Sequence, residues 1–145
     1  MRIDYDAEDL NSLSLVMWRE ARGEGHDGMR AVGHVICNRV GALGFPRTLH
    51  DVIYQKNAFT SMSVSSDPEF NLVPPPGDTQ FAYCSAICPS VLNGSDVDPT
   101  FGAHYYENAA AATSGWFARV IAGPDGYGTE GHSLTAHIGK QVFFI

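Results

Sequence analysis

One carboxylate lies where a helical pattern leads us to expect an apolar residue. Residues 6–22 have the spacing of an amphipathic helix whose apolar face is formed by Leu10, Leu13, Val16 and Met17. Glu20 falls on that same face. Burial disfavours the ionised form of a carboxyl group, so a glutamic acid at this position is suited to act as a general acid. An ion pair with Arg22, Arg30 or Arg39 would give Glu20 a structural role instead, and spacing alone leaves both interpretations open.

Glu24 is a second acid in the same segment. It follows Gly23, where the helix is expected to end, so its side chain should project toward water at the helix exit. This position favours Glu24 as a residue that lines the site, and not as the residue that donates the proton.

The histidines do not have the spacing of a zinc enzyme. His132 and His137 are five residues apart, His26 follows Glu24, and none of the six histidines forms an H-E-x-x-H pair or a zinc-finger pattern. We therefore expect no metal and no other cofactor. A zinc-dependent amidase or peptidase remains an alternative class of enzyme.

The composition excludes several classes of partner. The 145 residues include 9 Lys+Arg and 16 Asp+Glu, giving a formal net charge of −7, which argues against binding to nucleic acid. No apolar stretch approaches the ~20 residues that cross a bilayer, so no stable membrane association is expected. The acidic start, MRIDYDAED, predicts no signal peptide. The cysteines Cys37, Cys84 and Cys88 are interpreted as small buried apolar side chains.

Four helices are expected in a single domain over residues 1–145. Their predicted ranges are 6–22, 27–40, 49–55 and 78–93. Asp6, Asp51 and Asp78 are suited to cap helix N-termini, and residues 141–145 have the pattern of a strand. The rest is expected to be loops. Residues 56–77 form a long Ser- and Pro-rich stretch that is a candidate functional surface, and 123–133 form a glycine-rich insertion.

Several short motifs follow one another in the order of a known family. They are Glu20-Ala21-Arg22-Gly23-Glu24, Asn38-Arg39-Val40, Phe45-Pro46, Asp51-Val52-Ile53-Tyr54, Ala58-Phe59-Thr60, Val91-Leu92-Asn93-Gly94, Asp98-Pro99-Thr100, Gly102-Ala103-His104-Tyr105-Tyr106, Asn108, Trp116, His137-Ile138-Gly139 and Val142-Phe143-Phe144. Together they resemble the SleB-type cell wall hydrolases, the spore-cortex-lytic family, over roughly residues 10–144.

This resemblance implies a fold and a reaction. The fold is a mainly α (α+β), lysozyme-like or lytic-transglycosylase-like single domain with a small β element near the C-terminus. The reaction is cleavage of the peptidoglycan glycan strand between N-acetylmuramic acid and N-acetylglucosamine, with Glu20 as the catalytic acid. A lytic transglycosylase needs only this one acid, because the muramic 6-hydroxyl attacks C1 and gives a 1,6-anhydro product. Hydrolysis of the same bond by a muramidase is the alternative and would need a second carboxylate. The candidates for it are Glu24, Asp51, Asp67, Asp78 and Glu107.

The residues expected to bind substrate lie in or next to the same motifs. They are Glu24, Phe59, Thr60, Tyr105, Tyr106, Asn108 and Gln141. Flat rings with polar tips suit pyranose rings and N-acetyl groups, and only one of the two adjacent tyrosines can face the site. Two positions depart from the family pattern: Gln141 stands where the family tends to have His, and Ala58 where it often has Gln. Gln141 can still hydrogen-bond a sugar, but it cannot transfer a proton.

A non-catalytic glycan-binding module is a third class of function, and it would not need an acid on an apolar helix face. The expected biological context is a phage or prophage endolysin, which waits in the host cytoplasm until another protein opens the membrane. A wall-remodelling bacterial enzyme is the alternative. The chain is expected to act as a monomer on bacterial peptidoglycan.

Overall fold

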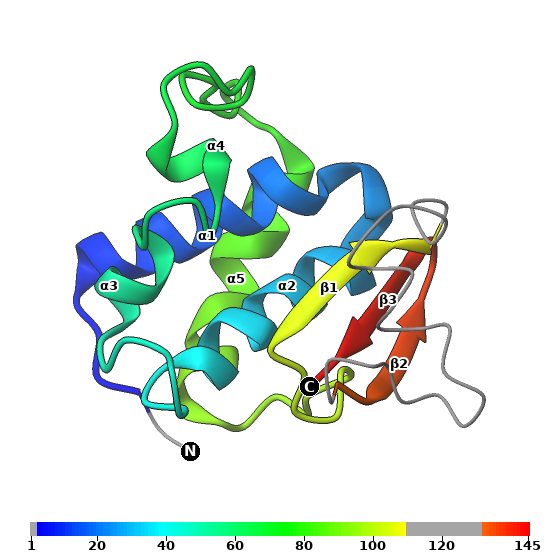
Figure 1. Ribbon diagram of the computed structural model, residues 1–145. Coiled ribbons are helices and arrows are strands. Elements are labelled where there is room, and N and C mark those ends of the chain that lie inside the picture. The colour runs from blue at the N-terminus through cyan, green and yellow to red at the C-terminus, as the bar shows by residue number, and fades with distance from the viewer. Residues whose placement is uncertain (1–2, 110–131) are drawn as a thin grey trace.

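The computed structural model describes residues 3–109 and 132–145, as a group of helices with a small sheet on one side (Figure 1). In chain order the elements are α1 (Ala7–Ala21), the 3-10 helix η1 (Arg22–Glu24), α2 (Gly25–Arg39), α3 (Leu49–Ile53), α4 (Thr60–Ser63), α5 (Thr79–Asn93), β1 (Tyr105–Asn108), β2 (Leu134–Ile138) and β3 (Gln141–Phe144). The predicted α+β class with a small β element near the C-terminus is therefore confirmed.

Helix ends follow the capping residues of the sequence. Asp6 caps α1 and exchanges hydrogen bonds with Asp9 in a capping box. Asp78 caps α5, which ends at Gly94 in the left-handed conformation. The prediction for Asp51 was wrong, because Thr48 caps α3 and its hydroxyl accepts the Asp51 N–H. A cap residue must precede the first turn, and Asp51 already lies within it.

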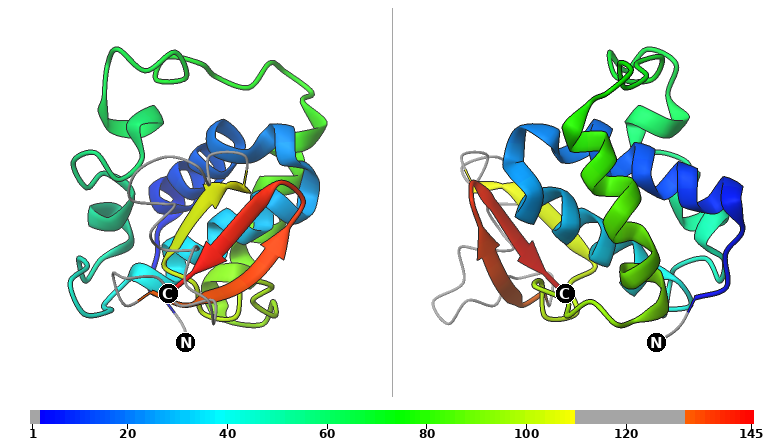
Figure 2. Two further views of the ribbon diagram at one scale, coloured as in Figure 1. Left: turned by 45° about the vertical axis from the view of Figure 1, so that its right-hand side comes forward. Right: turned by 180° about the vertical axis from the view of Figure 1, so that it is seen from behind.

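The three long helices pack on one another to form the main core. A Cβ added at Gly33 would lie 2.9 Å from the Met17 sulfur, so α1 and α2 approach closely at this glycine. In the view from behind, α5 lies across α1 and α2 on the side away from the sheet (Figure 2). α2 begins at Gly25 rather than at the predicted Asp27, since η1 carries the chain directly from one helix into the next.

All three cysteines are buried free thiols. Burial raises the pKa of Cys37 and of Cys84 to about 12, and that of Cys88 to about 11. They therefore remain protonated and act as small apolar side chains, as predicted.

The sheet has the strand order β1-β3-β2, and both pairings are antiparallel. Its inner face packs on α2 through Phe143, which shares a buried cluster with Ala31, Val35 and Ala103. β3 agrees with the predicted strand. β1 and β2 were predicted as loops, because four- and five-residue strands offer too little alternation to be recognised. They become strands by pairing with β3 (Figure 1).

The stretch 56–77 contains one short helix, α4, which was not predicted. Trp116 and most of the insertion 123–133 lie outside the described residues. In the part of the chain that the structure describes, no helix has the length and apolar character to cross a bilayer.

Candidate active site

Glu20 lies in the last turn of α1 and reaches the sheet. Its carboxylate oxygen Oε1 accepts a hydrogen bond of 2.8 Å from the hydroxyl of Tyr106 on β1. The side chain is half-buried. Two residues 86 positions apart in the sequence are thus joined at the candidate acid.

Tyr106 is a neutral donor to this carboxylate. Burial, followed by the adjacent Glu20 charge, raises the pKa of the Tyr106 hydroxyl well above its ordinary value. The phenol therefore keeps its proton at neutral pH. The other carboxylate oxygen, Oε2, accepts no hydrogen bond within residues 3–109 and 132–145. Among the described residues, one oxygen of Glu20 is held and the other has no donor bound to it.

The three arginines considered as structural partners of Glu20 all bind elsewhere. Arg22 pairs with Glu69, Arg30 pairs with Asp96, and Arg39 donates to the backbone oxygen of His104. Among the described residues Glu20 takes part in no ion pair. The interpretation of Glu20 as a structural ion pair is therefore wrong.

Glu24 lies at the junction of η1 and α2 and is half-buried rather than projecting into water. A Cβ added at Gly139 would lie 3.6 Å from its Oε2, so the carboxylate rests against the turn between β2 and β3. At Gly28 an added Cβ would lie only 2.4 Å from the Glu24 Cβ, so this glycine allows the side chain to fold over α2. Glu20 and Glu24 both face the sheet.

Gln141 and Asn108 are directly opposite each other at the β1–β3 pairing. Asn108 is exposed, whereas Gln141 is 7% exposed and its Oε1 has no hydrogen-bond partner within the described residues. An enclosed oxygen cannot touch a sugar without rearrangement. Turning the Gln141 side-chain amide by 180° would place its NH₂ group, a donor, at that enclosed position in place of the oxygen.

The two adjacent tyrosines have different surroundings, as expected for neighbours on a strand. Tyr106 binds Glu20, whereas the Tyr105 ring stacks on Phe144, with a centroid separation of 5.4 Å, and contacts Phe45. Tyr106 is therefore the tyrosine that faces the candidate acid.

Phe59 and Thr60 lie at the start of α4, and their surroundings argue against the predicted sugar contacts. The Phe59 ring is buried in the main core, with 2% of the residue exposed. The Thr60 hydroxyl donates to Asp67 at 2.5 Å within the same loop. An aromatic residue after a loop suits a core as well as a binding surface, so the sequence did not separate the two roles.

Two arginines that flank Glu20 hold the 64–77 loop against α1, a role that sequence reasoning missed. Arg19 donates to the backbone oxygens of Leu72 and Ser61. Arg22 pairs with Glu69, which raises the pKa of Arg22, and its guanidinium lies 4.2 Å from the Trp18 ring centre. The available signal was the charge on both sides of Glu20, but partners 42 to 53 residues away cannot be read from it.

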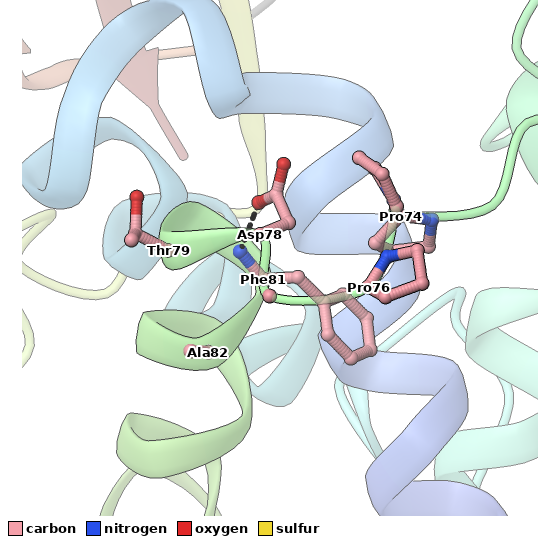
Figure 3. A pocket seen from close by; sticks show the side chains of 8 residues that line it. Pro74, Pro76, Asp78, Thr79, Phe81 and Ala82 are labelled. Carbon is pink, nitrogen blue, oxygen red and sulfur yellow. Dashed lines mark hydrogen bonds between the residues drawn. The ribbon is translucent and has the colours of Figure 1, made fainter.

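Three surface cavities lie away from this site. A cavity of about 420 Å³ lies between the run Pro74–Pro76 and the first turns of α5 (Figure 3). Its one acidic residue, Asp78, is engaged as the cap of α5 (Figure 3). Two others, of about 370 and 530 Å³, are lined by residues such as His34 and His50. Glu20 lines none of the three, so its assignment depends on its contacts and its helix position.

No group of three or more His, Cys, Asp or Glu side chains is placed to hold a metal ion in the described ranges.

Comparisons with known proteins agree with this geometry. The family model for cell wall hydrolases matches residues 23–144. The chain belongs to the cell wall hydrolase family. The matched range begins three residues after Glu20, so the match does not extend to the candidate acid.

Members of the family include spore cortex-lytic enzymes of known sequence. That of Bacillus cereus is 37% identical over 112 residues, which cover 77% of this chain and 39% of that protein. That of Bacillus subtilis is 33% identical over 140 residues, covering 96% and 38%. The chain thus spans less than two fifths of the length of these curated relatives.

Solved structures of the family share the fold. The catalytic domain of the germination-specific lytic transglycosylase SleB from Bacillus anthracis matches with a TM-score of 0.70 and 28% identity, covering 99% of this chain and 98% of that one. The catalytic domain of Bacillus cereus SleB matches with a TM-score of 0.69 and 28% identity, covering 97% and 91%. The resemblance to SleB-type enzymes and the lysozyme-like fold are confirmed.

Proposed function

We propose that this cell wall hydrolase domain cleaves peptidoglycan glycan strands as a lytic transglycosylase with Glu20 as its acid and base. The observation that carries the proposal is the Tyr106–Glu20 hydrogen bond, which holds one carboxylate oxygen and leaves the other unbonded among the described residues. The SleB domains that share its fold support the same reaction class.

The chemistry requires one carboxyl group in two protonation states. Protonated Glu20 donates from Oε2 to the glycosidic oxygen that joins N-acetylmuramic acid to N-acetylglucosamine, and the bond from that oxygen to C1 breaks. The resulting carboxylate then accepts the proton of the muramic 6-hydroxyl as its oxygen bonds to C1. Glu20 returns to its protonated state, and no water is consumed. Tyr106 can donate to Oε1 throughout, so it determines which oxygen exchanges the proton.

The local contacts of four other acids support transglycosylation over hydrolysis. Hydrolysis needs a second carboxylate about 5–9.5 Å from the first. Four candidates are engaged locally: Asp51 with His50, Asp67 with Thr60, Asp78 as a helix cap and Glu107 with the Asn108 N–H. Glu24 alone of the five accepts no hydrogen bond among the described residues. It is the residue through which a muramidase reaction would proceed.

Mass spectrometry of the released muropeptides tests this proposal. Purified peptidoglycan digested by the wild-type chain should give 1,6-anhydromuramic ends, lighter by one water than hydrolytic ends. Reducing muramic ends as the main product would establish hydrolysis, and Glu24→Gln should then abolish activity.

An endolysin role is a separate proposal about biological context. Expression of the chain in a bacterial host should cause lysis only when a membrane-permeabilising protein is co-expressed. Wall changes without that second protein would favour the alternative of a wall-remodelling enzyme.

A further inference from the structure

Arg39, the last residue of α2, is a buried cation with unused donors. The residue is 8% exposed, and within residues 3–109 and 132–145 its side chain makes one hydrogen bond, from Nε to the His104 backbone oxygen at 2.7 Å. Within the described residues no Asp or Glu pairs with it. Burial lowers the pKa of Arg39, whereas a carboxylate partner raises the pKa of Arg22 and of Arg30. A buried charge without a counter-ion is costly, which indicates that an anion is missing.

The guanidinium lies in a cage of aromatic rings. Its carbon is 5.0 Å from the Phe59 ring centre, 5.2 Å from that of Phe45 and 5.5 Å from that of Tyr105. These rings fix the cation in place and account for the burial of Phe59. They supply no hydrogen-bond acceptor for the two terminal nitrogens, Nη1 and Nη2.

Those terminal nitrogens are not fully enclosed. Neither makes a hydrogen bond within the described residues, and neither is among the unpaired polar atoms that are fully enclosed there. Those enclosed atoms belong to Trp18, Ser61, Thr135 and Gln141. Two of the five N–H donors of a guanidinium sit on each terminal nitrogen, so Arg39 can bind both oxygens of a carboxylate.

Arg39 belongs to the same site as the candidate acid. It binds the backbone of His104, two residues before Tyr106, and its positive charge acts on the Tyr106 hydroxyl. That hydroxyl donates to Glu20. The segment from His104 to Tyr106 therefore connects the hydroxyl that donates to Glu20 with a cation that has no ion-pair partner among the described residues.

We propose that Arg39 is a specificity-determining residue that binds a carboxylate of the peptidoglycan substrate. This inference rests on the proposed function. N-acetylmuramic acid carries a lactyl group that ends in a carboxyl, and the peptide attached to that carboxyl adds carboxylates of its own, whereas N-acetylglucosamine has neither. A cation bound to the segment that carries Tyr106 therefore provides a means to distinguish the muramic side of the glycosidic bond from the other side.

The net charge of the chain distinguishes binding by Arg39 from a general electrostatic attraction of the substrate. A net charge of −7 repels a carboxylated strand as a whole. A preference for carboxylated over neutral strands must come from a local cation.

Binding to three forms of glycan strand tests the proposal, using the Glu20→Gln variant so that nothing is cleaved. The strands are stripped of peptide with free lactyl carboxylates, stripped with the carboxylates converted to methylamides, or left with their peptides. By calorimetry, at least one carboxylated form should bind about tenfold more tightly than the methylamide form. The carboxylated form that binds more tightly identifies the lactyl group or the peptide as the source.

The double variant Glu20→Gln/Arg39→Gln should lose this preference. The matched control is Glu20→Gln/Arg47→Gln, because Arg47 is an exposed arginine outside the site, and it should keep the preference. Equal binding of all strands by Glu20→Gln, or an equal loss for all strands on adding Arg39→Gln, would overturn the proposal and leave Arg39 with a structural role.

Folding is checked by thermal unfolding of each variant. If Arg39→Gln does not fold, Arg39→Lys replaces it, and the preference should persist but weaken, because an ammonium lacks the bidentate fork. An unchanged or fully lost preference in folded Arg39→Lys would count against the proposal. Because binding is measured without cleavage, a carboxylate preference in a chain that cleaves nothing would overturn only the proposed reaction.

Discussion

Two polar clusters hold the chain around β1, and they differ in how completely their groups are paired. The loop cluster consists of Arg30, His34, Asn38, Asp96 and Asp98, and the acid cluster consists of Glu20, Tyr106 and Arg39. In the loop cluster Asp98 accepts hydrogen bonds at both oxygens, from Thr100 at Oδ1 and from Asn38 and the Gly102 N–H at Oδ2. In the acid cluster one oxygen of Glu20 and the terminal nitrogens of Arg39 make no hydrogen bond among the described residues.

This difference in pairing distinguishes a cluster that stabilises the fold from a cluster that can take part in a reaction. In the loop cluster three α2 side chains spaced four residues apart, Arg30, His34 and Asn38, reach two aspartates of the 94–102 loop and hold it on the helix. Both oxygens of Asp98 are occupied by these contacts. In the acid cluster Glu20 Oε2 and the terminal nitrogens of Arg39 have no partner among the described residues. Leaving polar groups without partners costs stability and is typical of a site that binds and reacts.

The largest expected effect tests the acid cluster. Glu20→Gln keeps the shape and the Tyr106 contact but cannot exchange a proton, so the rate of muropeptide release should fall about 10²–10⁴-fold. The unfolding temperature should change little. Glu8→Gln, at an exposed position in the first turn of the same helix, is the control. A Glu20→Gln protein that works at the wild-type rate would remove the acid from the proposal.

The loop cluster should show the opposite behaviour when broken. Asp98→Ala leaves the donors of Asn38, Thr100 and Gly102 without their acceptor, and the free energy of unfolding should drop by about 2–4 kcal/mol. Denaturant titration measures this loss. The rate of muropeptide release per folded molecule should stay within about a factor of three, because the contacts of Asp98 hold the loop and take no part in the proposed reaction. Full stability with lost activity would invalidate the division between the two clusters.

Tyr106→Phe should have an intermediate effect. It removes only the hydroxyl that holds Glu20, so kcat should fall about tenfold, which corresponds to one hydrogen bond, with little change in KM. Tyr5→Phe, at an exposed tyrosine near the N-terminus, is the matched control. A rise in KM at constant kcat would make Tyr106 a substrate-binding residue, as the sequence first suggested, and not a positioning residue.

Local signals in the sequence accounted for the helices and for the choice of the acid. Asp6 and Asp78 marked helix N-termini correctly because caps act within one turn. Glu20 stood out because a carboxylate on an apolar face breaks a local pattern. None of these inferences needed a contact between distant parts of the chain.

Features that depend on distant contacts could not be predicted. The Tyr106–Glu20 bond joins residues 86 apart, and the Arg22–Glu69 pair joins residues 47 apart. β1 and β2 exist because β3 lies between them. Phe59 was expected to contact sugar, but its burial follows from packing in the main core and beneath Arg39, neither of which is visible in its local sequence.

The smallest effect concerns pH and separates the paired aspartates from exposed ones. Burial raises the pKa of Asp98, but hydrogen bonds from Thr100 and Asn38 outweigh it and lower the pKa below the ordinary 3.8. A carboxyl with a lowered folded-state pKa stabilises the fold above its unfolded value, and this contribution is lost as the pH falls through the folded-state pKa. The stability difference between wild type and Asp98→Asn, measured in denaturant at several pH values, should therefore be largest near neutrality and shrink below about pH 4.

Asp96, whose pKa is also lowered, keeps part of the acid dependence in the variant. Asp4→Asn, at an exposed carboxylate near the N-terminus, should follow the wild-type curve. A difference that stays constant down to about pH 2 would mean that Asp98 stabilises the loop by shape and not by charge.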